Sequence, residues 1–513
     1  MSAKPNSCAH SRTRFVNSAM SMIYNLSMSL ISKVFTADEC RELDRLAIEE
    51  HDIPGFTLMQ HAGAFVFTTI QDRWPDIRSL RVVAGSGNNA GDGYVVALLA
   101  HQAGIATEVY QIGATNRIRG DALLAWQQLN EHEVPVVGEL NEADVVVDAL
   151  LGTGARGSLS PEYESAIAHI NNFKGPVVAI DLPSGIEASS GGLLTESPVT
   201  ADLTCMFIGA KLGLFTGLGL RYRGDLVFTD LGVPPEIYQD SFGVPILETT
   251  INRPVLPPRD PNAHKYEFGH VLVVGGDHGM GGAVILAAEA ALRTGAGLVT
   301  VLTRTENVPS VLARRPEVMA VGVDQATDIS SHLARADVLA IGPGLGQGSW
   351  GQTLLKTALA HNPVRSILDA DALRILKAQE WKVPEGCIFT PHPGEAAFLS
   401  GMTTANVQTN RPSFVQTISH QYGCTVVLKG PGTLIASHGQ LCSVSQFVDG
   451  ALATAGSGDV LTGITAATYA RLGNPVEAAE VAVSLHGAAG ARVVRENPGR
   501  SLIASDLIDA LRI

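Results

Sequence analysis

The chain lacks the cysteine patterns that build metal or disulfide sites. Its six cysteines are scattered, and none forms a C-x-x-C pair or joins a histidine cluster. We therefore expect a reducing compartment and no structural zinc. A long apolar run is missing as well, because no stretch reaches the ~20 residues needed to cross a bilayer. We expect neither a membrane span nor membrane binding.

Excess positive charge is also missing. The 36 Lys and Arg residues are outnumbered by 50 Asp and Glu, which gives a formal net charge of -14. This balance argues against broad electrostatic binding to nucleic acid or to an anionic membrane. Charged residues make up only 17%, hydrophobic residues 45%, and there are 53 glycines. That composition indicates a buried α/β core with many tight turns.

The first 33 residues lack acidic side chains but contain many serines and four basic residues. Such a composition resembles that of a transit peptide. The alternative is an extension created by an upstream start codon, with Met20, Met22 or Met28 as the real start. We expect residues 1–33 to be a disordered extension of a cytoplasmic protein, with organellar import as the alternative.

Strand-like and helix-like segments alternate along the rest of the chain. A helix is expected to begin at Thr36, because Glu39 follows three residues later as in a capping box. Strands are expected at residues 80–84, 107–112, 144–150, 177–180, 204–208 and 226–229. A second series is expected at 271–274, 298–302, 338–341, 366–368, 387–389 and 425–428, followed by two helical runs. Alternation of this kind predicts parallel sheets covered on both faces.

A proline-rich segment interrupts this alternation. Pro254, Pro257, Pro258 and Pro261 lie among polar residues, which is typical of a linker. We therefore predict two α/β domains, at residues 34–245 and 263–513, joined by a linker at 246–262.

A glycine-rich loop at residues 87–93 follows the first strand and precedes a helical run. Its sequence is neither the dinucleotide fingerprint GxGxxG nor a Walker A loop. Asn88, Asn89 and Asp92 offer hard oxygen ligands, which suit a cation as well as a phosphate. The alternative is that they only cap the helix and shape the turn.

Carboxylates at two further strand ends favour a binding site. Asp148 and Asp181 each end a predicted strand and precede a flexible loop. Carboxylates at one edge of a parallel sheet repel one another unless a cation, a proton or a hydrogen-bonding ligand stabilises them. A ligand site at this edge is therefore the preferred interpretation.

The motifs GNNAGDG, VDALLGTGARGS and AIDLPSG together resemble the YjeF-type NAD(P)H-hydrate epimerases. The resemblance implies a Rossmann-like three-layer αβα domain that interconverts the R and S forms of NADHX and NADPHX, the cofactors hydrated at C6. It implies potassium ligands at Asn89, Asp148 and Ser184. Ala90 departs from the family's usual glycine, which would narrow the backbone angles open to the loop. The implied substrate-binding residues are Asn88, Asn89, Ala90, Gly91, Asp92, Gly152, Thr153, Gly154, Ala155, Arg156, Gly157, Ser158 and Asp181.

Epimerisation at C6 requires a bond at that carbon to open and reclose on the other face. A carboxylate that exchanges protons with a departing and returning water would serve. Asp181 is the candidate for this catalytic role.

A second glycine-rich segment, Ala455-Gly456-Ser457-Gly458-Asp459, precedes a helix in the second half. Its amides could surround a transferring phosphoryl group while Asp459 accepts a hydroxyl proton. A glycine-rich turn with an aspartate cap is the alternative. It is less favoured because the segments GPGLG, TPHPGE and KGPGT also end predicted strands.

Those segments, with GAGLVTV, LDADAL and GSGDVLTGI, resemble the ADP- or ATP-dependent NAD(P)H-hydrate dehydratases of the ribokinase-like superfamily. The resemblance implies a ribokinase-like α/β domain, Mg²⁺ bound with ADP or ATP, and Asp459 as catalytic base. Asp371 would orient magnesium or substrate, or only cap a helix. The implied hydrated-cofactor residues are Ala283, Gly344, Gly346, His392 and Asp459, and the implied ADP-binding residues are Lys429, Gly430, Pro431, Gly432, Thr433 and Gly458.

Together these features predict a bifunctional metabolite-repair enzyme, an isomerase and a lyase in one chain, that uses NADHX, NADPHX and ADP or ATP. Family resemblance also implies a homo-oligomer. Two alternatives remain open at this point. One is a ribokinase-like kinase that releases a stable phosphorylated product, and the other is a nucleotide sensor without catalysis.

Overall fold

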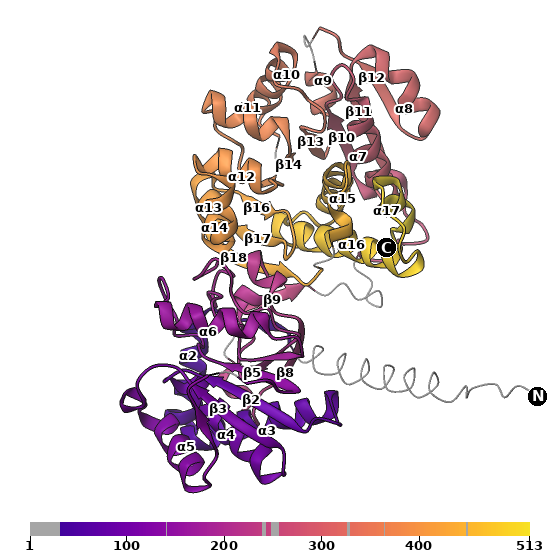
Figure 1. Ribbon diagram of the computed structural model, residues 1–513. Coiled ribbons are helices and arrows are strands. Elements are labelled where there is room, and N and C mark those ends of the chain that lie inside the picture. Colours follow the sequence, from indigo (N-terminus) through magenta and orange to yellow (C-terminus); the bar gives the residue numbers. More distant parts are fainter. Residues whose placement is uncertain are drawn as a thin grey trace, which may run out of the picture. The chain divides into compact units, whose positions relative to one another are not determined.

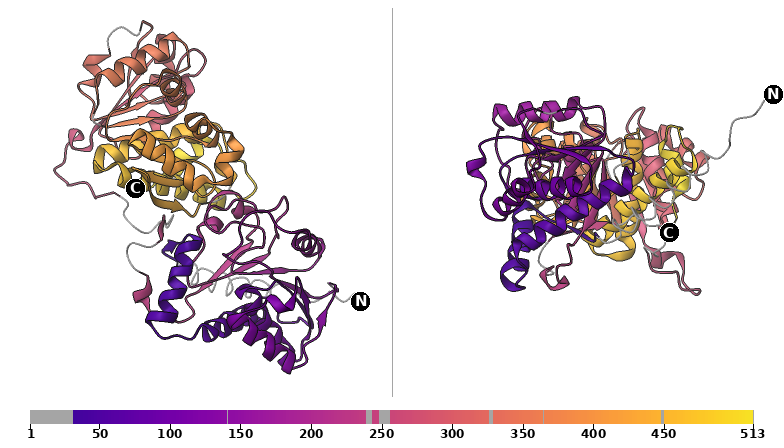
Figure 2. Two further views of the ribbon diagram at one scale, coloured as in Figure 1. Left: turned by 90° about the vertical axis from the view of Figure 1, so that its left-hand side faces the viewer. Right: turned by 60° about the horizontal axis from the view of Figure 1, so that its bottom comes forward.

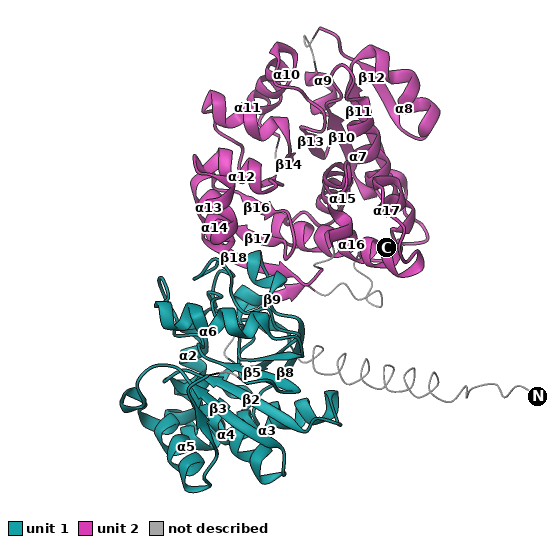
Figure 3. Ribbon diagram, viewed as in Figure 1, with its two compact units in different colours: residues 1–244 teal, residues 245–513 magenta. Residues whose placement is uncertain are grey.

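The computed structural model describes residues 31–139, 141–238, 243–247, 256–325, 329–363, 365–447 and 450–512. Nearly all of the expected N-terminal extension and the middle of the expected linker lie outside these ranges. The chain divides into two compact units, residues 1–244 and 245–513 (Figure 3). Each is described by itself below.

Unit 1 opens with the expected capped helix. In α2 (Ala37–Arg45), the Thr36 side chain accepts a hydrogen bond from the backbone N–H of Glu39, and the Glu39 carboxylate accepts one from that of Thr36. This reciprocal capping box confirms the predicted start. A π-helical turn (Leu46–Glu50) continues α2, and α3 (Gly55–Arg73) follows.

The sheet of unit 1 is parallel throughout, with strand order β4-β3-β2-β5-β6-β7-β8. The six strands predicted from the sequence are present, and β4 is an additional short edge strand. The bounds are β2 (Ser79–Ala84), β3 (Ala106–Gln111), β4 (Val136–Val137), β5 (Val145–Ala149), β6 (Val177–Ile180), β7 (Leu203–Phe207) and β8 (Asp225–Thr229).

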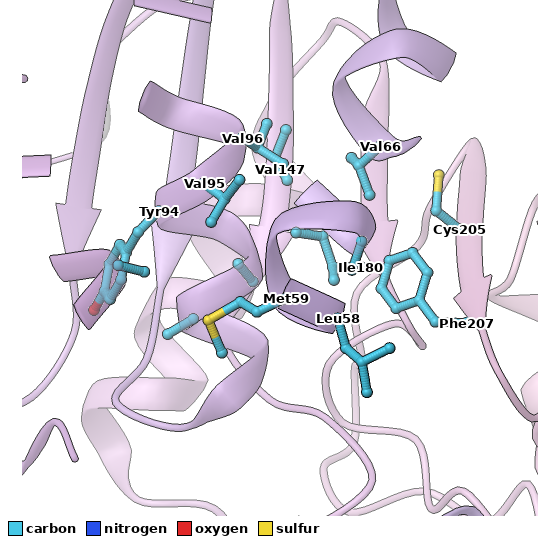
Figure 4. Close-up of a cluster of buried hydrophobic side chains, with 14 of the residues drawn as sticks. Leu58, Met59, Val66, Tyr94, Val95, Val96, Val147, Ile180, Cys205 and Phe207 are labelled. Atoms are coloured by element: carbon cyan, nitrogen blue, oxygen red, sulfur yellow. The ribbon is translucent and has the colours of Figure 1, made fainter. Parts of the chain in front are cut away.

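Helices cover both faces of this sheet (Figure 1). Val82 of β2 belongs to a core that includes α3, α4 (Asn88–Gln102) and α5 (Gly120–Glu131). The next residue, Val83, packs instead with side chains of α6 (Pro161–Asn172). Because successive strand residues point to opposite faces, the unit has three layers. Figure 4 shows part of the larger core, where Met59, Val95 and Ile180 meet.

Unit 2 has a larger sheet that is parallel at one end and antiparallel at the other. Its order is β18-β17-β16-β15-β14-β13-β10-β11-β12, and β9 (Val244–Leu247) pairs with β18. The pairs from β12 to β16 are parallel, whereas β16-β17-β18 is an antiparallel meander. The bounds are β10 (His270–Val274), β11 (Leu298–Thr303), β12 (Met319–Gly322), β13 (Val338–Ile341), β14 (Ser366–Leu368), β15 (Cys387–Phe389), β16 (Thr425–Leu428), β17 (Leu434–Ser437) and β18 (Gln440–Ser445).

Two helical layers enclose the parallel part of this sheet (Figures 1 and 2). One core joins alternate strand residues such as Val271 and Val273 to α7 (Gly281–Arg293), α15 (Ser457–Leu472) and α16 (Pro475–Glu496). The remaining helices are α8 (Val308–Arg314), α9 (Ser330–Leu333), α10 (Ser349–Ala360), α11 (Asp371–Gln379), α12 (Pro393–Ser400), α13 (Thr404–Thr409), α14 (Arg411–Tyr422) and α17 (Ala504–Ala510). In the part of the chain described, no helix is long and apolar enough to span a membrane.

Candidate active sites

A cavity of about 510 Å³ opens at the carboxyl ends of the unit 1 strands. The segment expected as a glycine-rich loop is in fact the first turn of a helix, because α4 begins at Asn88 with Gly87 as its N-cap. The free amides of a helix start favour an anion. Of the implied substrate residues, those that line the cavity are Asn88, Asn89, Asp92, Gly152, Thr153, Gly154, Ala155 and Asp181.

Close packing explains the small residues in this first turn. A Cβ on Gly91 would lie 2.5 Å from the terminal carbon of Met59, and one on Gly93 would lie 2.5 Å from that of Ala149. Ala90 is buried within the α-helical turn, where an L-residue is accommodated without strain. The expected restriction at Ala90 therefore costs the fold nothing.

Asn89, which lines the cavity, belongs to one hydrogen-bonded network with Asp148 and Ser184, which do not line it. The Ser184 hydroxyl donates to Asp148 (2.7 Å), and the Asn89 side chain donates to the carbonyl of Leu151 (3.0 Å), whose own N–H donates to Ser184 (3.0 Å). Burial raises the pKa of Asp148 to about 6, although the Ser184 hydrogen bonds oppose this. The carbonyl oxygen of Asn89 is buried without a hydrogen-bond partner among the described residues.

Asp181 forms an ion pair with Lys211, which the sequence reading did not identify. The Lys211 ammonium donates to Asp181 and to the carbonyl of Phe207 (3.1 Å). Lys211 is 4% exposed and Asp181 14%, so the pair lies against the cavity rather than in bulk water. Burial raises the pKa of Asp181, and the charge of Lys211 opposes that rise. Burial lowers the pKa of Lys211, but Asp181 and Cys40 outweigh it and the pKa is raised.

The backbone at this point of the site is strained. Asp181 has a φ of 68° and Ile208, which also lines the cavity, has a φ of 55°. Residues other than glycine seldom adopt such angles, and they persist where the surrounding structure holds them. Hydrogen bonds from Asp181 N–H to Cys205 (2.8 Å) and from Ile208 N–H to Thr229 (2.9 Å) hold both residues in place.

Three further carboxylates line the same cavity. Asp44 comes from α2, Asp92 from α4 and Asp121 from α5. Desolvation raises the pKa of Asp44 to about 6, and it raises that of Asp92 well above its usual range. The negative charge of Asp181 contributes to both shifts, while Lys211 opposes them.

Five of the implied substrate residues do not line the cavity. Ala90 and Gly91 are buried in α4, and Gly157 and Ser158 continue the loop beyond the lining. Arg156 is exposed and forms an ion pair with Asp38 of α2 (2.9 Å).

Unit 2 contains a second cavity, of about 310 Å³. Its polar side is formed by the loop between β16 and β17 and by the start of α15, and its apolar side includes Leu461 and Val483. The implied nucleotide residues that line it are Lys429, Gly430, Pro431, Thr433 and Gly458. Gly432 belongs to the same loop but does not line the cavity.

A buried arginine supports this loop from behind. Arg411 is 1% exposed and donates to the carbonyls of Leu428 (3.1 Å), Lys429 (3.3 Å) and Gly432 (3.4 Å). Burial lowers the pKa of its guanidinium to about 10. The five donors of a guanidinium suit this role, because one side chain can satisfy several carbonyls of a tight loop.

Lys429 is surrounded by carboxylates. Its Nζ lies 2.8 Å from Asp369 and 3.9 Å from Glu395. Burial lowers the pKa of Lys429, but Asp369, Glu395 and Asp459 raise it above its usual value. Burial raises the pKa of Asp459 to about 7, with Asp369 and Glu395 adding to the shift and Lys429 opposing it.

The glycine-rich segment before Asp459 is the N-terminus of a helix, as expected. Gly456 caps α15 with a φ of 83°, and Gly458 approaches Lys429 so closely that a Cβ there would lie 3.3 Å from Nζ. The Ser457 carbonyl and hydroxyl both lie within hydrogen-bond distance of buried His486 (3.1 and 3.2 Å). Burial lowers the pKa of His486 to about 4, so the ring is neutral near pH 7.

His392 caps α12 through its side chain. Its Nδ1 accepts hydrogen bonds from the N–H groups of Gly394 and Glu395, and its Nε2 lies 3.2 Å from the Glu395 carboxylate. The ring is therefore held in one direction while about half of the side chain stays exposed.

Of the implied hydrated-cofactor residues, His392 lines the 310 Å³ cavity, whereas Ala283, Gly344, Gly346 and Asp459 lie outside its lining. A Cβ on Gly344 would lie 3.3 Å from that of Ala283, so the GPGLG loop lies against the start of α7. Asp371 accepts hydrogen bonds from the N–H of Gly346 (3.0 Å) and from Gln347 (3.0 Å). Asp371 thus has a structural role in shaping the GPGLG loop.

The described residues contain no group of three or more His, Cys, Asp or Glu side chains arranged to hold a metal ion. The sequence reading missed Lys211 and Asp44 in unit 1, and Asp369, Glu395 and Arg411 in unit 2. Asp369 lies in the motif LDADAL and Glu395 in the motif TPHPGE, so these two residues could have been found from motifs that the sequence already singled out.

Each unit has its own cavity at the carboxyl edge of its sheet, with at least one carboxylate of raised pKa in the wall or beside it. That combination is typical of active sites. The fold and sites define an α/β enzyme with two separate small-molecule sites.

Comparison with known proteins agrees with this class. The family described as NAD(P)H-hydrate dehydratase matches residues 271–512, and the family described as YjeF-related protein N-terminus matches residues 55–213. The bifunctional NAD(P)H-hydrate repair enzyme Nnr of Coxiella burnetii is 40% identical over 93% of this chain and 98% of its own length. The Escherichia coli enzyme of the same name is 36% identical, over 94% of each chain.

Among solved structures, an ADP/ATP-dependent NAD(P)H-hydrate dehydratase from Bacillus subtilis, co-crystallised with ATP/Mg²⁺, covers 50% of this chain and 91% of its own. Its identity is 32% and its TM-score 0.45. From the long matches to the repair enzymes, the chain belongs to the family of bifunctional NAD(P)H-hydrate repair enzymes. It carries an epimerase domain of the YjeF type followed by a nucleotide-dependent dehydratase domain.

Proposed function

We propose that the 510 Å³ cavity of unit 1 is where R- and S-NAD(P)HX exchange, with Asp181 as a proton-transfer group. The ion pair with Lys211 supports this role, because it favours the ionised carboxylate that must accept a proton. The strained φ of Asp181 supports it as well, since strain of this kind is concentrated at functional sites. Lys211 orients the carboxylate and keeps it close to the cavity.

Potassium fits the hydrogen-bonded network that contains Asn89. The buried carbonyl oxygen of Asn89 has no hydrogen-bond partner among the residues described, and buried Asp148 lies in the same network. Asn89, Asp148 and Ser184 would hold the ion through hard oxygen atoms. When bound, K⁺ would supply positive charge that offsets the cost of burying the Asp148 carboxylate. It would also fix the start of α4, where the dinucleotide phosphates are expected to bind.

In unit 2, the 310 Å³ cavity would bind ADP or ATP. Its apolar wall suits an adenine ring, while the Lys429 loop and the start of α15 suit the phosphates. Asp459 would accept the proton of the C6 hydroxyl as that oxygen takes the phosphoryl group. Its raised pKa, about 7, is the single observation that supports this assignment best, because a general base works best with a pKa near the operating pH.

Phosphorylation solves a leaving-group problem. Hydroxide leaves carbon poorly, whereas phosphate leaves readily, so elimination of phosphate restores the dihydropyridine ring. The amides at Gly456 to Gly458 would stabilise the charge that develops during transfer. Mg²⁺ bound with the nucleotide would neutralise phosphate charge, with carboxylates beside Lys429 completing its ligands.

The test uses the full chain with mixed NADHX epimers and either ADP or ATP, followed by recovery of NADH absorbance. Wild type should convert both epimers with a preferred nucleotide. Asp459→Ala should abolish nucleotide-dependent recovery and leave epimer exchange intact. Asp181→Asn should abolish epimer exchange and leave nucleotide-dependent recovery of NADH from the S epimer intact. Loss of both activities in either variant would contradict this division of labour. Release of a stable phosphorylated product would contradict the dehydration step.

A further inference from the structure

Helix α2 places a carboxylate in the epimerase cavity that the mechanism above does not use. Cys40, Asp44 and Ile48 follow one another at intervals of four residues and all line the cavity. Residues four apart share a face of a helix, so this face of α2 and of the turn that continues it forms one wall of the cavity. Arg41 also lines the cavity but forms an ion pair with Asp38, so Asp44 is the one carboxylate that α2 contributes to the lining.

Asp44 belongs to the same electrostatic group as Asp181. It interacts with Asp181 and Lys211, and Asp92 from α4 interacts with all three. The group thus contains three carboxylates and one ammonium. Even with a proton held by Asp92, whose pKa is raised well above its usual range, these four side chains keep a net negative charge. Arg41 and Asp121 also line the cavity, but they add one basic and one acidic side chain and leave that balance unchanged.

That charge fits the chemistry of exchange at C6. When the C6–O bond breaks, the lone pair of the ring nitrogen N1 forms an N1=C6 double bond and leaves a cationic ring. A carboxylic acid gives its proton to the departing hydroxyl, which leaves as water. Water then adds to C6 from the other face, the N1=C6 pair returns to N1, and a carboxylate takes the proton released. A site with net negative charge stabilises the cationic ring relative to the neutral substrate.

The two faces of the ring place separate demands on the protein. Water departs from one face and returns to the other, and one rigid side chain reaches both faces poorly. Asp181 stands at the end of β6, whereas Asp44 comes from α2, so the cavity receives carboxylates from two different elements. We propose that Asp44 is a second proton-transfer group of the epimerase, which works with Asp181 on the departing and returning water. This inference rests on the proposed role of the unit 1 cavity.

The variant Asp44→Asn tests the proposal in the full chain, with Glu42→Gln as the matched control, because Glu42 is on the same helix but does not line the cavity. Asp44→Asn should lower the R-to-S exchange rate by about 10²-fold, the usual contribution of one acid–base group. Dehydration of S-NADHX by the same preparation should stay at the wild-type rate, as should both activities of Glu42→Gln. Asp44→Glu should recover part of the exchange rate.

The pH profile supplies a readout that a merely structural role would not move. The exchange rate of the wild type should show a titration near pH 6, the pKa to which desolvation raises Asp44. The charged or titratable groups that line the same cavity are Cys40 and Arg41 on the same helix, Asp92, Asp121, Tyr163, Asp181 and Lys211. Asp44→Asn should remove that titration. An exchange rate within about twofold of wild type and an unchanged profile would overturn the role of Asp44, whereas an unchanged rate in Asp181→Asn would overturn the proposed site itself.

Discussion

Lys429 and Asp369 form an ion pair in unit 2, with Nζ 2.8 Å from the Asp369 carboxylate, which is 2% exposed. Thr462 of α15 donates to the other oxygen of Asp369 (2.7 Å). Asp369 therefore connects Lys429, in the loop between β16 and β17, to helix α15, which begins with the glycine-rich segment. The negative charge of Asp369 also raises the pKa of Asp459.

The dehydratase should depend on pH through Asp459. Since the base must be ionised and burial raises its pKa to about 7, kcat/KM for S-NADHX should fall below that pH and level off above it. Asp459→Asn should lose about 10²- to 10⁴-fold in rate. A profile that is flat from pH 5 to pH 8 would contradict the assignment.

The same aspartate should reduce stability as pH rises. Its folded pKa is raised above the unfolded value of 3.8, so the folded state binds more protons between pH 4 and 7. Stability contributed by the protonated carboxyl is complete below the unfolded pKa and is lost as pH rises through the folded pKa. Asp459→Asn should therefore unfold at a higher temperature than wild type at pH 8, and at nearly the same temperature at pH 4. Calorimetry of the two proteins at both pH values measures this difference.

Asp369→Asn should shift the pH profile of the dehydratase. The negative charge of Asp369 raises the pKa of Asp459. Neutralising Asp369 should therefore move the fall in kcat/KM, expected near pH 7, to lower pH. Thr468→Ser is a suitable comparison. Thr468 is buried in α15, the helix that contains Asp459, but its hydroxyl donates to the carbonyls of Thr465 and Ala478 and not to Asp369. If the fall in kcat/KM stays at the same pH after Asp369→Asn, the two carboxylates are not coupled.

Potassium should stabilise unit 1 selectively. Adding K⁺ to protein in a tetramethylammonium buffer should raise the temperature at which unit 1 unfolds, because an ion that binds only the folded state stabilises it by mass action. Asn89→Ala and Asp148→Asn should each remove the response, since both residues supply oxygens to the proposed ion site. Dehydration of S-NADHX serves as the control and should not change with these substitutions. An equal response in wild type and both variants would contradict a site at this network.

Arg411 should control nucleotide binding without touching the nucleotide. Arg411→Met removes the donor to the carbonyls of Leu428, Lys429 and Gly432, and each buried acceptor left without a donor costs about 1–3 kcal/mol. The KM for the nucleotide should rise by about tenfold or more while kcat falls less, and Arg411→Lys should restore part of the affinity. Epimer exchange should be unaffected, which separates a local effect from misfolding. An unchanged KM in Arg411→Met would contradict the positioning role.

The regular elements could be predicted because their signals are local. The reciprocal cap at Thr36 and Glu39 was visible in four residues, and the buried parallel strands were short apolar runs between turn residues. The antiparallel strands β17 and β18 were missed, because their short segments mix apolar and polar residues. The glycine-rich segment at 87–93 was correctly placed at the sheet edge but read as a loop, although its residues from Asn88 are helical.

The chemistry of the sites was only partly visible in the sequence. Asp181 and Asp459 followed from strand-end and helix-start patterns, but their charged partners did not. Lys211 lies 30 residues from Asp181, and Lys429 lies 60 residues from Asp369. Such pairs form because separate strands end at one edge of a sheet, so the local spacing of residues in the sequence does not predict them.

The antiparallel pairing of β16 with β17 constrains the length of the loop between them. Leu428 of β16 pairs directly with Leu434 of β17, so Lys429 to Thr433 form a closed loop of fixed length. An inserted residue would lengthen the loop away from Arg411. A deleted residue would shift β17 by one position relative to β16, which would turn buried Ile435 to the opposite face. The strand pairing therefore fixes the length of this loop, whatever side chains it carries.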